Sequence, residues 1–502
     1  MRTLPLRSES LDPPMSVDVT GAELKRGAFF NSIAILASNF RGIFTFLIAR
    51  LLGPAALGTF SVAWAATDLI SKVGIFGLDN AITTFIARSE AIGDRARSRA
   101  LFRLAVALGV GLSVGVALLS VVAVRLLGER LGLPREMVSA IAVLLCAIPG
   151  VALYRISIAV SRGVKVMQHD IYSRGITEPL ATTLAFLIAL GIGLVAFAPE
   201  LAAIVGTAAS GIVALALAAR LFRDVPTGKG VPSLRGETRK LIAYAAPIGA
   251  YQLLNTFIFR LDVIMLGFFI GRAPGVTLAT VGVYGAVVDV AGGLRKVNQA
   301  FNPIFAPVVA GMTVTGEQER AAATYSRLAQ WMLWILLPLV AVMALAGSTI
   351  LMIFGPEFRQ GGMWLGIVAA ACATNAFVSL GETVIMVQRP GLNLINSSIA
   401  GAIAIAANLW LIPRFGVTGA AFGILVPYVV QGILRSAILR FIFRWRNPWS
   451  NIAPPVVAAI VALIPALICH ALVQGIAGQL TAGTLFLVIF GMAWIWHFRF
   501  RR

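Results

Sequence analysis

The sequence predicts an all-α polytopic membrane protein, and three observations support this fold class. Of its 502 residues, 59% are hydrophobic and only 12% are charged, whereas a soluble domain carries about 25% charged residues. The mean hydropathy is +0.89. Fourteen apolar runs are long enough to cross a bilayer, which takes about 20 residues. This composition cannot supply a polar surface, so soluble, disordered and fibrous proteins are excluded.

The first expected element is a disordered cytosolic tail over residues 1–24, because this polar segment lacks the apolar stretch of a signal peptide. About fourteen membrane-spanning helices follow. The second and eighth exceed one crossing, so we expect them to tilt or to extend beyond the lipid. The approximate limits of the runs are 27–49, 55–87, 101–127, 137–160, 176–198, 200–221, 241–270, 279–309, 324–347, 363–387, 393–412, 417–440, 452–475 and 479–498.

The distribution of basic residues predicts the orientation. The formal net charge is +20, from 41 Lys+Arg and 21 Asp+Glu. With both termini in the cytoplasm, 28 basic residues lie on the cytoplasmic side, seven lie outside and six fall within runs. Membrane proteins concentrate Lys and Arg in cytoplasmic loops. This bias accounts for the net charge, so we expect no nucleic-acid partner.

The segments between the runs are too short to form separate catalytic domains. The longest, residues 223–240, is a linker between an N-terminal half (25–222) and a second half (241–440), and residues 441–502 hold two further helices. The sequence has no GxxxxGK[ST] phosphate-binding motif and no large outer loop, so we expect a transporter rather than an enzyme. The three cysteines are scattered in apolar runs, so we expect no metal or other cofactor.

The two halves share a weak repeat. At an offset of 224 residues, Leu57-Gly58-Thr59-Phe60 matches Val281-Gly282-Val283-Tyr284, and Lys72 coincides with Lys296. Both halves begin on the cytoplasmic side, so the repeat is parallel, about an axis normal to the membrane. Such repeats build alternating-access transporters with a site between the halves.

Charged residues within the runs are the candidates for that site, because a charge near the bilayer centre costs about 2.5–3.5 kcal/mol. Arg155 can reach the cytoplasmic surface, and Asp68 and Lys72, four residues apart, can neutralise each other. Glu382 can pair across helices. Such pairing leaves four cations unexplained, which are Arg41, Arg260, Arg295 and Lys296. These four predict a cationic central cavity for an anionic headgroup such as a diphosphate. The alternative is that they form structural ion pairs.

Lys72 joins these four as a candidate for contact with diphosphate and glycan. Asn31 and Asn39, in the first run, can hydrogen-bond sugar or bridge helices. Three acids are candidates for ion coupling: Asp68, Asp79 and Asp289. In the eighth run, Gly292-Gly293 and Asn302-Pro303 predict a kinked helix.

Several short motifs occur in a family-specific order. They are Ile48–Pro54, Leu57–Phe60, Gly77–Ala81, Arg260-Leu261-Asp262, Met265–Gly267, Val281–Tyr284, Phe301–Pro303, Phe354–Phe358 and Ile412–Ala421. Over about residues 27–440, the sequence resembles the polysaccharide-exporter branch of the multidrug/oligosaccharidyl-lipid/polysaccharide (MOP) exporter superfamily.

This resemblance implies two six-helix lobes arranged in a V, with two extra C-terminal helices. It also implies a flippase that moves a polyprenyl-diphosphate-linked oligosaccharide to the outer leaflet for O-antigen (lipopolysaccharide) or exopolysaccharide assembly. The expected location is the bacterial cytoplasmic (inner) membrane. The expected partners are the lipid-linked oligosaccharide, membrane lipids and other polysaccharide-assembly proteins.

Two alternatives share this architecture. One is a lipid II flippase of peptidoglycan synthesis. The other is a cation-coupled multidrug antiporter, which should have an acidic cavity, whereas the charges within these runs are in basic excess. A membrane-embedded glycan ligase or polymerase is a third, more distant alternative, which the short outer loops disfavour.

Overall fold

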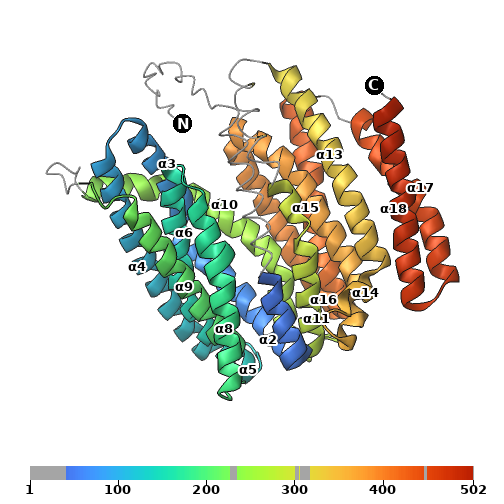
Figure 1. Cartoon of the computed structure of the whole chain (residues 1–502), viewed down its shortest axis with the longest axis horizontal. Helices are drawn as coiled ribbons and strands as arrows, with labels where there is room; N and C mark the ends of the chain where they lie inside the picture. Colours follow the sequence, from blue (N-terminus) through green and yellow to red (C-terminus); the bar gives the residue numbers. More distant parts are fainter. Residues whose placement is uncertain are drawn as a thin grey trace.

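The computed structural model describes residues 41–225, 234–299, 305, 312, 317–445 and 449–500. All regular elements in these residues are helices (Figure 1). Eleven helices in the described residues are long and apolar enough to cross a membrane. The all-α membrane fold class is therefore confirmed, while the count of fourteen crossings and the location of the termini stay predictions.

The helices fall into three groups along the chain. The first contains α2 (Arg41–Ile75), α3 (Leu78–Ala91), α4 (Arg95–Leu127), α5 (Arg135–Leu144), η2 (Leu145–Ala147), α6 (Ile148–Gly163), α7 (Gln168–Asp170), η3 (Ile171–Thr177), α8 (Glu178–Gly191) and α9 (Ala198–Arg220). The second contains α10 (Leu234–Phe268), α11 (Leu278–Gly292), α13 (Gln318–Leu345), α14 (Gly347–Leu351), η4 (Pro356–Gly361), α15 (Gly362–Gln388), α16 (Pro390–Ala437) and η5 (Ile438–Ile442). The third is the pair α17 (Trp449–Leu472) and α18 (Gly475–Phe500).

Helix direction defines two ends of the bundle. We call the "basic end" the one at which α9 ends and α10 and α13 begin, at the top of Figure 1. The "opposite end" holds the α4–α5 and α10–α11 connections. The orientation predicted from the sequence places the basic end in the cytoplasm.

Two long helices each turn back at a glycine. In α2, Gly53 has φ 84°, and in α16, Gly416 has φ 57°. Positive φ is accessible to glycine without the steric cost that a Cβ brings. Each turn lies where the sequence predicts that one run ends and the next begins. The labels α2 and α16 therefore each cover two antiparallel helical segments that are joined at the glycine.

The second run is predicted to be one long helix that tilts or extends beyond the lipid, but in the structure it is divided between α2 and α3. The chain breaks at Phe76 (φ 48°) and Gly77 (φ 76°), which separate α2 from α3. At this break the backbone meets α10, since a Cβ on Gly77 would lie 2.5 Å from the carbonyl oxygen of Ala245 and 2.6 Å from the amide nitrogen of Gly249. The close approach of α10 needs glycine here, and glycine also permits the break.

In the eighth run, α11 ends at Gly292 and two turn residues follow before the helix resumes at Arg295. Asn302-Pro303, the other part of the predicted kink, lies outside the described residues.

The contact between α2 and α11 supports the internal repeat. A Cβ on Gly58 would meet the backbone of Leu278 and Gly282, and a Cβ on Gly282 would meet Pro54 and Gly58. Pro54 and Leu278, like Gly58 and Gly282, are 224 residues apart. Equivalent residues therefore touch each other reciprocally, as they do at a two-fold axis. This pseudo-two-fold axis runs between α2 and α11 near the opposite end.

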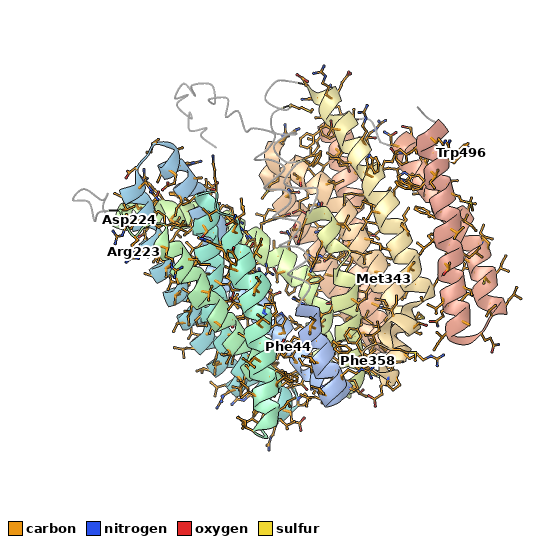
Figure 2. The ribbon with its side chains drawn as sticks, in the orientation of Figure 1. Phe44, Arg223, Asp224, Met343, Phe358 and Trp496 are labelled. Atoms are coloured by element: carbon orange, nitrogen blue, oxygen red, sulfur yellow. The ribbon has the colours of Figure 1, made fainter. Side chains whose placement is uncertain are left out.

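The two halves share one large core, in which Phe44 of α2 and Phe358 of η4 are both buried (Figure 2). Helix α10 also links the halves. Its first part, with Leu241 and Ala245, belongs to a buried cluster with residues of α3, α4 and α6, whereas Leu266 belongs to the large core. Figure 1 shows α10 running from the α3–α4 group toward α2 and α11.

The α17–α18 hairpin lies at the edge of the bundle beside α13 (Figure 1). Trp334 and Leu345 of α13 pack against Phe486 and Phe490 of α18. Trp496, on α18, is 66% exposed and lies on the outer edge (Figure 2). The outward side chains of α17 and α18 are mostly apolar, as is typical of helices that face lipid.

Candidate functional site

An ion pair joins α2 and α10 midway along their crossing. Arg260 Nε donates to Asp68 Oδ2 at 2.9 Å, and the two side chains are only 16% and 19% exposed. Asp68 interacts electrostatically with Lys72, as predicted, but its ion pair is with Arg260. The prediction that Arg260 has no pairing partner is therefore wrong. A charge-assisted bond from a guanidinium is stronger than a contact between neighbours on one helix.

Lys72 lies one turn beyond Asp68, toward the basic end. Within the described part of the chain, no carboxylate lies at ion-pair distance from its ammonium group. Its electrostatic neighbours are Arg155, Asp68, Asp79 and Arg174. Since the side chain is partly buried, Lys72 has a positive charge that its surroundings leave incompletely balanced.

Arg155 does not extend to the surface as the sequence predicts. Its Nη1 lies 3.8 Å from Asp79 Oδ2, which ties α6 to α3. Both residues line a polar cavity of about 130 Å³ within the first group of helices. Tyr154, Arg162 and Arg174 also line this cavity, and Arg162 pairs with Asp170 across its rim.

Arg295 follows α11 and meets α10 and α15. Its guanidinium carbon lies 3.8 Å from the ring centre of Phe259, and that of Arg260 lies 4.9 Å from the same ring. One aromatic ring thus stabilises two cations. Arg295 Nε also donates to Asn375 Oδ1 at 3.2 Å. Among the described side chains, Arg295 has a neutral hydrogen-bond partner and no ion-pair partner.

The remaining predicted site residues are dispersed. Asp289 accepts a hydrogen bond of 2.7 Å from Thr45 of α2, and Lys296 is half-buried beside Arg295. Arg41 is the first residue of α2, and its side chain lies outside the described part, as do Asn31 and Asn39 entirely.

A separate pair lies within the second group of helices. Glu382 pairs with Arg435 at 2.9 Å and accepts a hydrogen bond from Tyr251, so the predicted pairing across helices is confirmed.

We use "charged cluster" for the residues at the junction of α2, α3, α6, η3, α10 and the segment after α11. It contains five cations and two carboxylates. Glu178 and Asp170, which lie just outside this set, are electrostatic neighbours of Arg174 and partly balance its charge. The other cations leave a positive excess that suits an anionic ligand. The members of the charged cluster are Lys72, Arg155, Arg174, Arg260, Arg295, Asp68 and Asp79.

Sequence reasoning missed several contributors to this cluster. Arg174 falls between the predicted runs 137–160 and 176–198, so the sequence indicates only a loop charge there. In the structure it lies in the π-helix η3, an irregular element often found at functional sites. Phe259 precedes Arg260 directly, which is a weak signal. Nothing in the sequence indicates that Asn375 reaches Arg295.

Comparisons with known proteins place this geometry in a family. A family model described as "Polysaccharide biosynthesis protein" matches residues 24–309. The sequence matches none of the curated proteins. Among solved structures, the fold is similar to that of the lipid II flippase MurJ in an inward closed conformation, with TM-score 0.72, 10% identity, and coverage of 94% of this chain and 99% of MurJ.

Two further solved structures share the fold. One is an inward-facing multidrug resistance MATE family transporter of the MOP superfamily, with TM-score 0.63, 14% identity, and coverage of 86% of this chain and 99% of that one. The other is a MOP superfamily transporter from Pyrococcus furiosus, with TM-score 0.57, 13% identity, and coverage of 86% and 96%. At these identities the likeness concerns the fold alone. The match to the family model covers more than half of the sequence, and the chain therefore belongs to the polysaccharide biosynthesis protein family of the MOP superfamily.

Proposed function

We propose that this protein is a flippase that moves a polyprenyl-diphosphate-linked oligosaccharide from the cytoplasmic to the outer leaflet, for assembly of a surface polysaccharide such as O-antigen or exopolysaccharide. The observation that carries the proposal is the positive excess of the charged cluster, to which both halves of the chain contribute. The family and the fold, which are those of flippases and transporters, support it.

A diphosphate matches the chemistry of the unpaired cations. Among the described residues, Lys72 has no ion pair, and Arg295 has only an amide oxygen and an aromatic ring as partners. A cation at this depth costs about 2.5–3.5 kcal/mol unless an anion or water compensates it. Phosphate oxygens accept two parallel bonds from a guanidinium and one from an ammonium group.

The position of the cluster suits entry from the cytoplasm. The halves close on each other at the opposite end, through Gly58 and Gly282 and through hydrogen bonds from Arg272 to the carbonyls of Leu131 and Gly132. Lys72 follows Gly58 by fourteen residues, or about 21 Å along an ideal helix, toward the basic end. Substrate would reach the cluster from the basic end, and separation of α2 from α11 would open the outer side, while the lipid tail stays in the bilayer.

The test is deletion of the gene in the native host, followed by profiling of lipid-linked glycans and surface polysaccharide. We expect loss of one polymer, with its diphosphate-linked repeat unit trapped on the cytoplasmic face. The variants Lys72→Ala, Arg295→Ala and Lys296→Ala should complement poorly. Arg130→Ala, at an exposed site of the opposite end, is the matched control and should complement fully.

Other outcomes favour the alternatives. Accumulation of the peptidoglycan precursor would identify a lipid II flippase. Unchanged surface glycans with new sensitivity to cationic drugs would identify a multidrug antiporter and would contradict the assignment of the charged cluster to diphosphate.

A further inference from the structure

A buried carboxyl group lies far from the charged cluster, at the opposite end of the bundle. Glu200 is in the first turn of α9 and is only 3% exposed. Its Oε2 atom is buried and has no hydrogen-bond partner among the described residues. The side chain lines a cavity of about 530 Å³, which is large enough to hold several water molecules.

The cavity offers Glu200 no compensating cation. Its other charged residues are Arg135 and Glu136 of α5, and Arg135 is engaged with Glu129 at 3.3 Å. The elements that complete the wall, which are α2, residues 195–197 and the start of α11, contribute no charged side chain. Burial disfavours the ionised carboxylate, whereas the amino-terminal dipole of α9 favours it.

The cavity also crosses the junction between the halves. Leu278, the first residue of α11, forms part of the wall opposite Leu52 and Thr59 of α2. The carbonyl oxygen of Leu278 is the atom that a Cβ on Gly58 would meet first, at 2.0 Å. Separation of α2 from α11 would widen this cavity and expose Glu200 further to water. Hydration favours the ionised form.

We propose that Glu200 is a proton-binding site, which is protonated while the opposite end is closed and releases its proton through this cavity when α2 and α11 separate. A proton suits this site because it needs only one carboxyl oxygen, and Glu200 Oε2 is buried with no hydrogen-bond partner among the described residues. The acids predicted from the sequence are already engaged: Asp68 with Arg260, Asp79 with Arg155 and Asp289 with Thr45.

Proton binding at Glu200 does not depend on the proposed transport function. Only the further step, that this proton is coupled to substrate transport, rests on it. By linkage, a proton that binds the closed form more tightly favours closure, and a rise in pH favours opening. One proton changes the ratio of open to closed molecules by up to tenfold per pH unit.

The test uses the full chain in lipid nanodiscs, with spin labels on both halves at the opposite end. Arg130→Cys and Arg359→Cys supply exposed sites, on a background with Cys146, Cys372 and Cys469 replaced by Ser. Electron–electron distances are measured from about pH 5 to about pH 8. We expect longer distances at high pH in the parent, and short distances at every pH in Glu200→Gln, which mimics the protonated acid.

Glu136→Gln is the matched control, because it removes an exposed acid from the same cavity and should keep the pH response. The parent and Glu200→Gln should agree at low pH, which shows that the variant folds. A parent that ignores pH, a Glu200→Gln variant that responds like the parent, or a response to sodium at fixed pH would overturn the proposal. The measurement needs no substrate, so its failure is distinguishable from a failure to flip glycans.

Discussion

Removal of the Asp68–Arg260 ion pair should loosen the junction between the two halves. Asp68→Asn keeps the shape of the side chain but removes its charge, and Arg260→Gln does the same for the partner. The pair joins α2 to α10 at 2.9 Å, with both side chains more than four-fifths buried. In the proposed transport cycle, α2 and α10 would change their relative position, and this pair would oppose that change.

The size of the effect follows from this geometry. A hydrogen bond between charged groups contributes about 1.5–3 kcal/mol. Removal of one member also leaves the other charge buried without its partner, which adds to the cost. We take about 2 kcal/mol, which corresponds to about a thirtyfold change in the ratio of two conformations.

The assay measures distances between spin labels at the basic end. Met167→Cys and Arg327→Cys place one exposed label on each half, again on the cysteine-free background. Asp68→Asn and Arg260→Gln should each shift the ratio of short to long distances by about thirtyfold, and the double variant should resemble either single variant. The matched control is Asp79→Asn, which breaks a pair within the first half and should leave the distances unchanged.

Two results would refute this reasoning. In one, the effects of Asp68→Asn and Arg260→Gln simply add in the double variant, which would show that the two side chains act independently. In the other, Asp79→Asn has the same effect as Asp68→Asn, which would show that any lost carboxylate in this region disturbs the fold.

Three further predictions concern single side chains. Gly282→Ala should lower the unfolding midpoint by an amount equivalent to about 1–3 kcal/mol, because its Cβ would overlap the carbonyl oxygen of Pro54; Gly292→Ala, which has open space, should be neutral in the same thermal scan. Phe259→Leu should remove the cation–π contact that holds the guanidinium groups of Arg260 and Arg295, at a cost of about 0.5–2 kcal/mol. Transport rates in vesicles should fall, while circular dichroism should show that the protein stays folded. Burial lowers the pKa of His169, which lies outside the spanning segments, below its usual 6.5. The stabilising contribution of the neutral ring is therefore present above about pH 6.5 and is lost as the pH falls. His169→Gln should accordingly lose less thermal stability than the parent protein between about pH 7 and about pH 5.

The fold was largely predictable because lipid imposes strong constraints on sequence. Long apolar runs have few alternatives to spanning helices, since unpaired backbone groups are costly in hydrocarbon. The turns at Gly53 and Gly416 were also marked, because each follows an apolar run and supplies a residue that tolerates positive φ. The repeat was visible because equivalent small residues, Gly58 and Gly282, have to touch at the axis.

The side-chain partners were not predictable in the same way. Spacing of four residues suggested that Asp68 would pair with Lys72, but a helix crossing brings Arg260 closer, and such a crossing has no local sequence signal. The same holds for Arg155, whose position near a helix end suggested solvent although α3 provides Asp79. Glu200 was overlooked because its place in the first turn of a helix is ordinary for an acid, and only the packing of α2, α5 and α11 encloses it.

Reconstitution in vesicles shows whether the protein transfers a diphosphate-linked glycan across the membrane. The purified chain is placed in vesicles that contain polyprenyl-diphosphate-linked oligosaccharide, and a membrane-impermeant reagent then measures how much glycan reaches the outer leaflet. We expect the accessible fraction to rise beyond that of protein-free vesicles, with little rise for Lys72→Ala or Arg295→Ala and a full rise for Arg130→Ala. An accessible fraction equal to that of protein-free vesicles, from protein shown to be folded, would contradict the account.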